Sequence, residues 1–403
     1  MDRKELGIYV HIPFCVRKCA YCDFLSFPAP GQVQQDYFRA LREEIASFDR
    51  AGEYEAVSVY FGGGTPSLPP SGEITQTLDV IRRTFFVRED AEITIECNPG
   101  TLDGERLEDY KSAGFNRLSI GLQSADDDLL RMLGRIHSWE TFLKEYRKAR
   151  RTGFDNISID LMYGLPCQTL ASFEDTLRKV TALSPEHLSA YSLIIEEGTP
   201  FWDRYHEDAE ARRRGDTPLF LPGEDEEDRM LEMLKASLRK IGMHRYEISN
   251  YAVPSRESRH NTGYWKRREY AGFGLGASGQ TGKTRYRNTS LIADYLLAAF
   301  EGGKDRGGTE EKNSIRGKNR FREEEILLTR EDEISETMIL GLRMTEGVDL
   351  QHFEETFSVR AEELFEKEIR EFRQAGLLEL SGHHLYLTDR GFDVSNLVMC
   401  SFM

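Results

Sequence analysis

The chain has 403 residues, of which 39% are hydrophobic, and a formal net charge of -16 at pH 7. This length predicts one large domain with a sizeable core, followed by a smaller one. The negative charge repels a phosphate backbone, so we do not expect nucleic acid as a partner.

The sequence carries no sign of export or of membrane insertion. No uncharged apolar run of about 18 residues occurs, and the N-terminus lacks the pattern of a signal peptide. We therefore expect a cytoplasmic protein that is not an integral membrane protein. Three of the six cysteines lie within eight residues, and the others, Cys97, Cys167 and Cys400, are scattered. This distribution is not that of a disulfide framework, and we expect the scattered three to be ordinary buried thiols.

Short apolar runs alternate with segments of helical periodicity in the first half of the chain. The expected strands are residues 8–11, 57–61, 93–97, 117–121, 157–162 and 187–192. Helical spacing of apolar residues occurs over 36–48, 74–83, 141–151 and 173–183. The pattern predicts an α/β fold with about six βα units, a partial (β/α)6 barrel over residues 1–300. Such barrels carry their chemistry at the C-terminal ends of the strands.

The last quarter of the chain differs in composition. Residues 302–325 are charged and rich in glycine, which predicts a flexible linker over 301–328. Residues 329–403 show three amphipathic helical stretches and then a hairpin, 377–380 and 385–388, around Ser381 and Gly382. This predicts an α+β, winged-helix-like domain. Acidic residues crowd its start, which favours a packing or lid role over DNA binding: Glu323, Glu324, Glu325, Glu331, Asp332, Glu333 and Glu336.

A compact cysteine motif follows the first expected strand. Cys15, Cys19 and Cys22 form a CxxxCxxC pattern on one loop. Three thiolates for four irons leave one iron of a 4Fe–4S cluster open to an external ligand. The alternatives are a zinc site with His11 as fourth ligand, or free thiols. The aromatic residues Phe14, Tyr21, Phe24 and Phe27 are expected to shield the cluster from water.

Polar and glycine residues mark the ends of the following strands. Gly62, Gly63 and Gly64 precede Thr65, and they would let the backbone approach a ligand closely. A simple turn is the alternative. Each of the next three expected strands also has a polar residue within it or just after it. Glu96 lies at the end of 93–97, Gln123 follows 117–121, and Asp160 lies within 157–162. A lone buried carboxylate is costly unless it is paired or bound to a ligand, so their convergence favours a polar guest over internal salt bridges.

The motif Tyr-Val-His-Ile-Pro-Phe-Cys at 9–15, with the two further cysteines, resembles the radical S-adenosylmethionine superfamily. Within it, the chain is similar to the oxygen-independent coproporphyrinogen III oxidase family and its heme chaperone branch. The resemblance implies a radical S-adenosylmethionine TIM-like barrel whose open iron binds S-adenosylmethionine. Reduction of the sulfonium then releases a 5′-deoxyadenosyl radical.

The resemblance also assigns cofactor residues. It implies that Tyr9, Gly63 and Glu96 bind the cluster-bound S-adenosylmethionine. It associates a further set with a second S-adenosylmethionine: Tyr21, Gly64, Thr65, Gln123, Arg135 and Asp160. Whether this chain has both sites is left open.

Three features distinguish the two branches. The oxidase pattern CxxxCxxCxC is broken here, because Cys22 is followed by Asp23 and Phe24. Only eight residues precede Tyr9, whereas the oxidases carry an N-terminal extension. His260, Tyr264 and Trp265 resemble the HNxxYW motif of the chaperone branch, in which an imidazole and flat aromatic faces suit heme. A packed or capping histidine is the alternative. The glycine-rich residues 270–278 are expected either to close the barrel or to form a tightly packed strand.

These features predict a heme chaperone that binds heme, a 4Fe–4S cluster and S-adenosylmethionine and passes heme to an acceptor hemoprotein, such as a membrane-bound respiratory one. No catalytic residue is assigned. An electron donor such as flavodoxin or a reductase is implied. The alternatives are an oxygen-independent coproporphyrinogen III oxidase, or a radical enzyme acting on another substrate. The C-terminal domain would serve a carrier as a docking or gating surface, and an enzyme as a lid.

Overall fold

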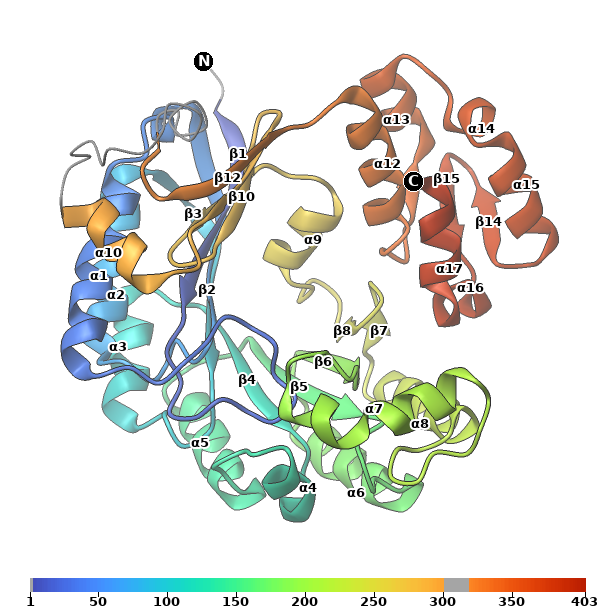
Figure 1. Ribbon diagram of the computed structural model, residues 1–403, viewed down its shortest axis with the longest axis horizontal. Coiled ribbons are helices and arrows are strands. Elements are labelled where there is room, and N and C mark those ends of the chain that lie inside the picture. Colours follow the sequence, from blue (N-terminus) through green and yellow to red (C-terminus); the bar gives the residue numbers. More distant parts are fainter. Residues whose placement is uncertain (1–2, 301–318) are drawn as a thin grey trace.

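Six parallel strands of the large domain lie side by side in their order along the chain (Figure 1). They are β1 (Lys4–Ile12), β2 (Tyr54–Gly63), β3 (Phe86–Cys97), β4 (Arg117–Gln123), β5 (Ile157–Tyr163) and β6 (His187–Ser192). The computed structural model describes residues 3–300 and 319–403. Each predicted strand is confirmed, and the six pair as a continuous parallel sheet.

Helices connect these strands and cover the outer face of the sheet (Figure 1). They are α1 (Gly31–Ala46), α2 (Ser71–Thr84), α3 (Gly104–Ala113), α4 (Asp127–Met132), α5 (Trp139–Arg151) and α6 (Leu170–Thr181), with a 3-10 turn η1 (Ala51–Glu53). The four predicted helices are confirmed, and α3 and α4 are additional. Side-chain caps at Asp103, Ser138 and Thr169 begin three of them.

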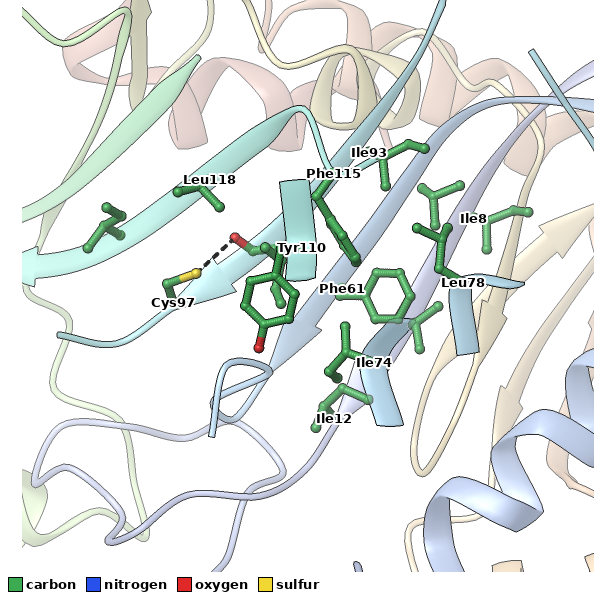
Figure 2. Packing of buried hydrophobic residues seen from close by; sticks show 14 of the residues in the cluster. Ile8, Ile12, Phe61, Ile74, Leu78, Ile93, Cys97, Tyr110, Phe115 and Leu118 are labelled. Carbon is green, nitrogen blue, oxygen red and sulfur yellow. Dashed lines mark hydrogen bonds between the residues drawn. The ribbon is translucent and has the colours of Figure 1, made fainter. Parts of the chain in front are cut away.

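Residues along each strand alternate between two environments. Figure 2 shows Ile8, Phe61, Ile93 and Leu118 packed together with side chains of α2 and α3, and all are buried. The intervening residues point the other way, into the barrel. The parallel register places these inward-pointing residues of neighbouring strands side by side, such as Glu96 beside Ser119 and Asp160 beside Ser189. The barrel interior is therefore polar, while the helix layer covers the apolar core.

Shorter strands extend the sheet at both ends. Beside β1 lie β9 (Tyr270–Phe273), β10 (Ser278–Thr281), β11 (Thr284–Asn288) and β12 (Arg322–Leu327); beyond β6 lie β8 (Asn250–Ala252) and β7 (His244–Arg245). The connecting helices are α7 (Pro200–Arg213), α8 (Glu224–Lys240), α9 (Arg259–Trp265) and α10 (Ile292–Phe300). Within the described residues the two sheet ends do not pair, so the barrel is partial, and the glycine-rich segment adds β9 to β1.

The linker prediction for 301–328 is wrong over 322–327. These residues form β12, which pairs antiparallel with β11, and Arg287 forms an ion pair with Glu324 across the two strands. Charged side chains are tolerated there because β12 is an edge strand with an exposed face. Residues 301–318, the rest of the predicted linker, lie outside the described residues.

The C-terminal domain has winged-helix connectivity. Its elements are α12 (Arg330–Gly341), β13 (Val348–Asp349), α13 (Leu350–Phe357), α14 (Ala361–Leu364), α15 (Glu366–Gln374), β14 (Leu378–Ser381), β15 (His384–Leu387), α16 (Asp389–Asp393), α17 (Ser395–Met399) and η2 (Cys400–Phe402). The sheet order is β13-β15-β14, and the predicted hairpin is confirmed. The domain has its own apolar cluster around Met338, Phe353 and Leu385.

Acidic residues of α12 pack this domain against the barrel domain. Glu333 forms ion pairs with Arg267 and Lys283, and Glu336 forms ion pairs with Arg267 and Arg285. This agrees with the packing role expected for the acidic segment. Among the described helices, none combines the length and apolarity needed to cross a bilayer.

Candidate functional site

The cysteine loop leaves the C-terminal end of β1 and is fixed at both ends by backbone hydrogen bonds. Cys15 N–H donates to Phe27 O at 3.2 Å, and Phe27 N–H donates to Pro13 O at 2.8 Å. The Phe14 and Phe27 rings meet edge to face beneath the loop. His11 Nε2 donates to Leu25 O at 2.9 Å from inside the barrel. These contacts place the loop over the barrel opening, where the sequence predicts it.

The segment after α4 holds the middle of the same loop. Ala20 N–H donates to Leu133 O at 3.0 Å, and the Arg17 guanidinium donates to Gly134 O at 2.8 Å. Arg135 lies deeper, and its Nη1 is 3.6 Å from Cys19 Sγ. The segment therefore contacts both the backbone and one thiol of the cysteine motif.

The three thiols are free, half-buried and close to one another. Burial raises the pKa of Cys22, and nearby Cys19 and Cys15 add to the shift. The alternative zinc ligand His11 is not available as placed, because Nε2 donates to Leu25 O and Nδ1 accepts from Tyr9 Oη at 3.0 Å. In the parts of the chain that the structure describes, no three His, Cys, Asp or Glu side chains surround a single metal position. A cluster does not require that arrangement, because each thiolate binds a different iron. The half-buried thiols fit a 4Fe–4S cluster.

Two expectations are wrong, one about the shielding of these thiols and one about the burial of the scattered cysteines. Phe24 is 68% exposed and does not shield the thiols. Cys97 is buried as expected, but Cys167 and Cys400 are exposed. Cys167 lies in the loop after β5 with a φ of 60°, and Cys400 lies in the terminal turn η2. Neither belongs to a strand or helix face that packs on the core.

The glycine run at the end of β2 packs against the cysteine loop and His11. A Cβ on Gly63, whose φ is +113°, would lie 2.6 Å from His11 Cε1. A Cβ on Gly64 would lie 2.9 Å from Phe14 O, and Gly64 N–H donates to Ile12 O at 2.8 Å. The glycines are needed for this close packing of the protein on itself, whereas sequence reasoning offered a close approach to a ligand or a simple turn as their purpose.

Glu96 projects into the barrel beside this run. Tyr60 Oη donates to Glu96 Oε1 at 2.8 Å, and Gly63 N–H donates to Oε2 at 3.1 Å. Burial raises the pKa of Glu96 to about 7, and the Tyr60 hydrogen bond opposes the shift. Tyr9 stacks on Tyr60 with ring centroids 6.3 Å apart. The structure thus brings Tyr9, Gly63 and Glu96 together as predicted.

A second polar group lies between the cysteine loop and β4. Arg135 Nη2 donates to Asn98 Oδ1 at 2.6 Å and to Gly121 O at 2.7 Å. Asn98 Nδ2 donates in turn to Thr65 Oγ1, which lies 3.4 Å from Cys15 Sγ. Gln123, with a φ of 70°, places its amide beside Gly121. The predicted Thr65, Gln123 and Arg135 are therefore neighbours, and Tyr21 lies close to Arg135.

Asp160 and Glu96 share an unusual feature. Asp160 accepts hydrogen bonds from Ser119 Oγ at 3.1 Å, and burial raises its pKa. Both carboxyl groups are half-buried and feel the charge of the buried Arg117, yet among the described residues neither Asp160 nor Glu96 forms an ion pair. Internal salt bridging was the alternative reading of these carboxylates. Two half-buried carboxyl groups without an ion-pair partner instead make the interior suitable for a positively charged guest.

The motif of His260, Tyr264 and Trp265 is divided between two places. His260 is 3% exposed inside the barrel, where its Nδ1 is 3.0 Å from Ser58 Oγ and its Nε2 is 2.9 Å from Tyr264 Oη. Trp265 lies instead at the contact with the C-terminal domain, under the Arg343 guanidinium at 4.2 Å. In this conformation the three side chains do not form one heme-binding surface.

Sequence reasoning missed two interior residues, Asn98 and Glu92. Asn98 connects Arg135 to Thr65, and its signal is a polar residue directly after a buried strand. Glu92 accepts hydrogen bonds from the backbone N–H groups of Arg259 and His260 and so holds α9 in the barrel. Its position within the polar start of β3 gives no local signal of this contact, because α9 is distant in sequence.

Comparison with known proteins agrees with this geometry. The family model "Radical SAM superfamily" matches residues 9–180, and "HemN C-terminal domain" matches 328–394. The chain is 35% identical to Heme chaperone HemW of Bacillus subtilis over 98% of each chain. It is 35% identical to Heme chaperone HemW of Lactococcus lactis over 100% of this chain and 98% of the relative.

Among solved structures, coproporphyrinogen III oxidase (HemN) of Escherichia coli matches with a TM-score of 0.79 at 24% identity. The match covers 99% of this chain and 90% of the oxidase chain, and it shows a shared fold. Together with the arrangement of the cysteine loop and barrel, these matches show that the chain belongs to the radical S-adenosylmethionine superfamily and, within it, to the HemW family.

Proposed function

We propose that the protein is a heme chaperone that carries a 4Fe–4S cluster on Cys15, Cys19 and Cys22 and binds S-adenosylmethionine beside it. The observation that carries the cofactor site is the pair of half-buried carboxyl groups inside the barrel, Glu96 and Asp160, neither of which forms an ion pair within the described residues. The names of the relatives support the chaperone role, as does Phe24 where the oxidase pattern has a fourth cysteine. We expect it to act in the cytoplasm.

The residues have distinct roles in this proposal. The Glu96 carboxylate accepts a hydrogen bond from the amino group of S-adenosylmethionine. Tyr9 and Gly63 lie beside Glu96 and border the position of this amino group. Tyr21, Gly64, Thr65, Gln123, Arg135 and Asp160 are the proposed contacts of a second S-adenosylmethionine. When bound, the cluster supplies single electrons from a reductant such as flavodoxin.

Cofactor binding is expected to depend on pH through Glu96. Its pKa is raised to about 7, so only about a tenth of the carboxyl groups are ionised at pH 6 and most are ionised at pH 8. The ionised form attracts an amino group, so affinity should rise as pH increases through 7. Equilibrium dialysis of labelled S-adenosylmethionine between pH 6 and 8 measures this. Glu96→Gln should weaken binding and flatten the profile; an unchanged slope in that variant would contradict the role of Glu96.

The sequence prediction that His260, Tyr264 and Trp265 contact heme stays a prediction. Both nitrogens of His260 are hydrogen-bonded within the barrel. A bond from His260 to heme iron therefore requires α9 to move from its described position. Heme binding through this residue would be coupled to opening of the barrel.

The chaperone proposal predicts heme uptake and transfer without porphyrinogen turnover. Heme titration followed by absorbance should show saturable binding, and loaded protein should convert an apo-hemoprotein of a respiratory membrane complex to its heme-bound form. Under anaerobic conditions with reductant, coproporphyrinogen III should remain unconverted, with a known oxidase as positive control. Robust decarboxylation would overturn the proposal in favour of the oxidase.

A further inference from the structure

The helix α9 places an imidazole ring against the aromatic residues that border Glu96. His260 stacks on Tyr60 with ring centroids 5.0 Å apart and an interplanar angle of 20°. It also lies 6.4 Å from the Tyr9 ring at 29°, and Tyr9 lies 6.3 Å from Tyr60 at 24°. The three rings are thus nearly parallel, and His260 is the member contributed by the distant part of the chain.

We propose that His260 is a positioning residue of the S-adenosylmethionine site: it holds the Tyr60 ring in place, and Tyr60 in turn orients the Glu96 carboxylate. Tyr60 connects the two residues, because its ring stacks on His260 and its hydroxyl donates to Glu96 Oε1 at 2.8 Å. If the Tyr60 ring tilts, that hydrogen bond is lost. The inference rests on the cofactor site proposed above at Glu96.

The barrel is shaped to keep the His260 ring in this place. Gly7 on β1 faces it, and a Cβ there would lie 3.7 Å from His260 Cε1 and 3.5 Å from Ser58 Oγ. On the far side of Tyr60, a Cβ on Gly62 would lie 2.9 Å from Tyr60 Cε1. A side chain at Gly62 would therefore crowd the Tyr60 ring. A methyl group at Gly7 would lie at ordinary van der Waals distance from the His260 ring.

Hydrogen bonds then fix the ring and its helix. Ser58 Oγ and Tyr264 Oη bind the two ring nitrogens, and the Glu92 carboxylate accepts from the N–H groups of Arg259 and His260. Burial lowers the pKa of His260 to about 3, so the ring stacks as a neutral imidazole at physiological pH. An imidazole whose two nitrogens are both hydrogen-bonded to the protein is suited to a fixed structural role. An imidazole that ligates iron needs one of its nitrogens free for the metal.

Binding of S-adenosylmethionine to reconstituted protein, measured by dialysis and by its effect on the electron paramagnetic resonance spectrum of the reduced cluster, tests the proposal. His260→Ala removes the ring and should raise the dissociation constant about tenfold, as is typical when a partner that orients a binding group is lost. His260→Phe keeps a flat ring against Tyr60 and should stay within about threefold of the unsubstituted protein. His260→Gln keeps hydrogen-bonding groups without a ring, and it should weaken binding as His260→Ala does even if the alanine variant folds poorly.

His187→Ala is the matched control. His187 is equally buried in the same barrel, and both of its nitrogens are hydrogen-bonded, to Ser158 and Tyr246, but its aromatic neighbour is Tyr246. His187 reaches Asp160 through Ser158 but makes no contact with Tyr60 or Glu96, so its loss should leave the effect of S-adenosylmethionine on the cluster spectrum unchanged.

Three outcomes would overturn the proposal: unchanged affinity in both His260→Ala and His260→Gln, equal weakening in His260→Phe, or an equal loss of the cofactor's effect on the cluster spectrum in His187→Ala. Loss of heme binding in every His260 variant with intact cofactor affinity would assign the residue to heme instead. A complete lack of cofactor binding by the unsubstituted protein would remove the proposed site itself and this inference with it.

Discussion

Replacing Cys15, Cys19 or Cys22 with serine, one at a time, is expected to abolish stable cluster binding. Each thiolate ligates a separate iron, and a serine hydroxyl is a much poorer ligand for it than a thiolate. The variants should show little bound sulfide and lose the charge-transfer absorbance after anaerobic reconstitution. They should still fold, because all three side chains are only half-buried on a loop.

Cys400→Ser is the matched control for these three variants. Cys400 is exposed in η2 of the C-terminal domain. It should therefore retain the full iron and sulfide content. Loss of the cluster in Cys400→Ser, or its retention in any of the three loop variants, would contradict the ligand assignment.

Gly63→Ala is expected to damage both the fold and the cofactor site. An alanine at a φ of +113° costs about 1–3 kcal/mol in backbone strain. Its Cβ would also lie 2.6 Å from His11 Cε1 and 2.7 Å from Nδ1. His11 would have to move, which breaks its hydrogen bonds to Leu25 O and Tyr9 and loosens the cysteine loop. Thermal unfolding and cofactor binding measure the two consequences.

Gly100→Ala separates strain from collision. Gly100 has a similar φ of +96°, but no atom lies within 4 Å of a Cβ built there. It should lower the free energy of unfolding by the strain alone and leave cofactor affinity unchanged. If Gly63→Ala behaved like Gly100→Ala in both measurements, the proposed contact between the glycine run and His11 would be wrong.

The six parallel strands and the winged-helix domain follow from local patterns. Apolar residues such as Ile93 and Leu118 recur at every second strand position, and the hairpin around Gly382 has clear turn residues. The strand β12 was missed because its residues are charged; it is stabilised by pairing with β11, a contact that no local pattern reveals.

The proposed cofactor residues can be picked out from the sequence, but their surroundings cannot. The cysteines and Glu96 lie in recognisable motifs, whereas the partners of Glu96 depend on strand register. The placement of α9 inside the barrel depends on Glu92, which lies 168 residues before His260 in the chain. For the same reason the sequence motif 260–265 predicted one aromatic heme surface, while the fold directs His260 and Trp265 to different places.

Anaerobic reconstitution with iron and sulfide, followed by electron paramagnetic resonance of the reduced protein with and without S-adenosylmethionine, tests the central claim most directly. We predict about four irons and four sulfides per chain, and a signal that changes when the cofactor binds the open iron. Protein that holds tetrahedral zinc without sulfide, or a cluster signal that S-adenosylmethionine leaves unchanged, would contradict the account.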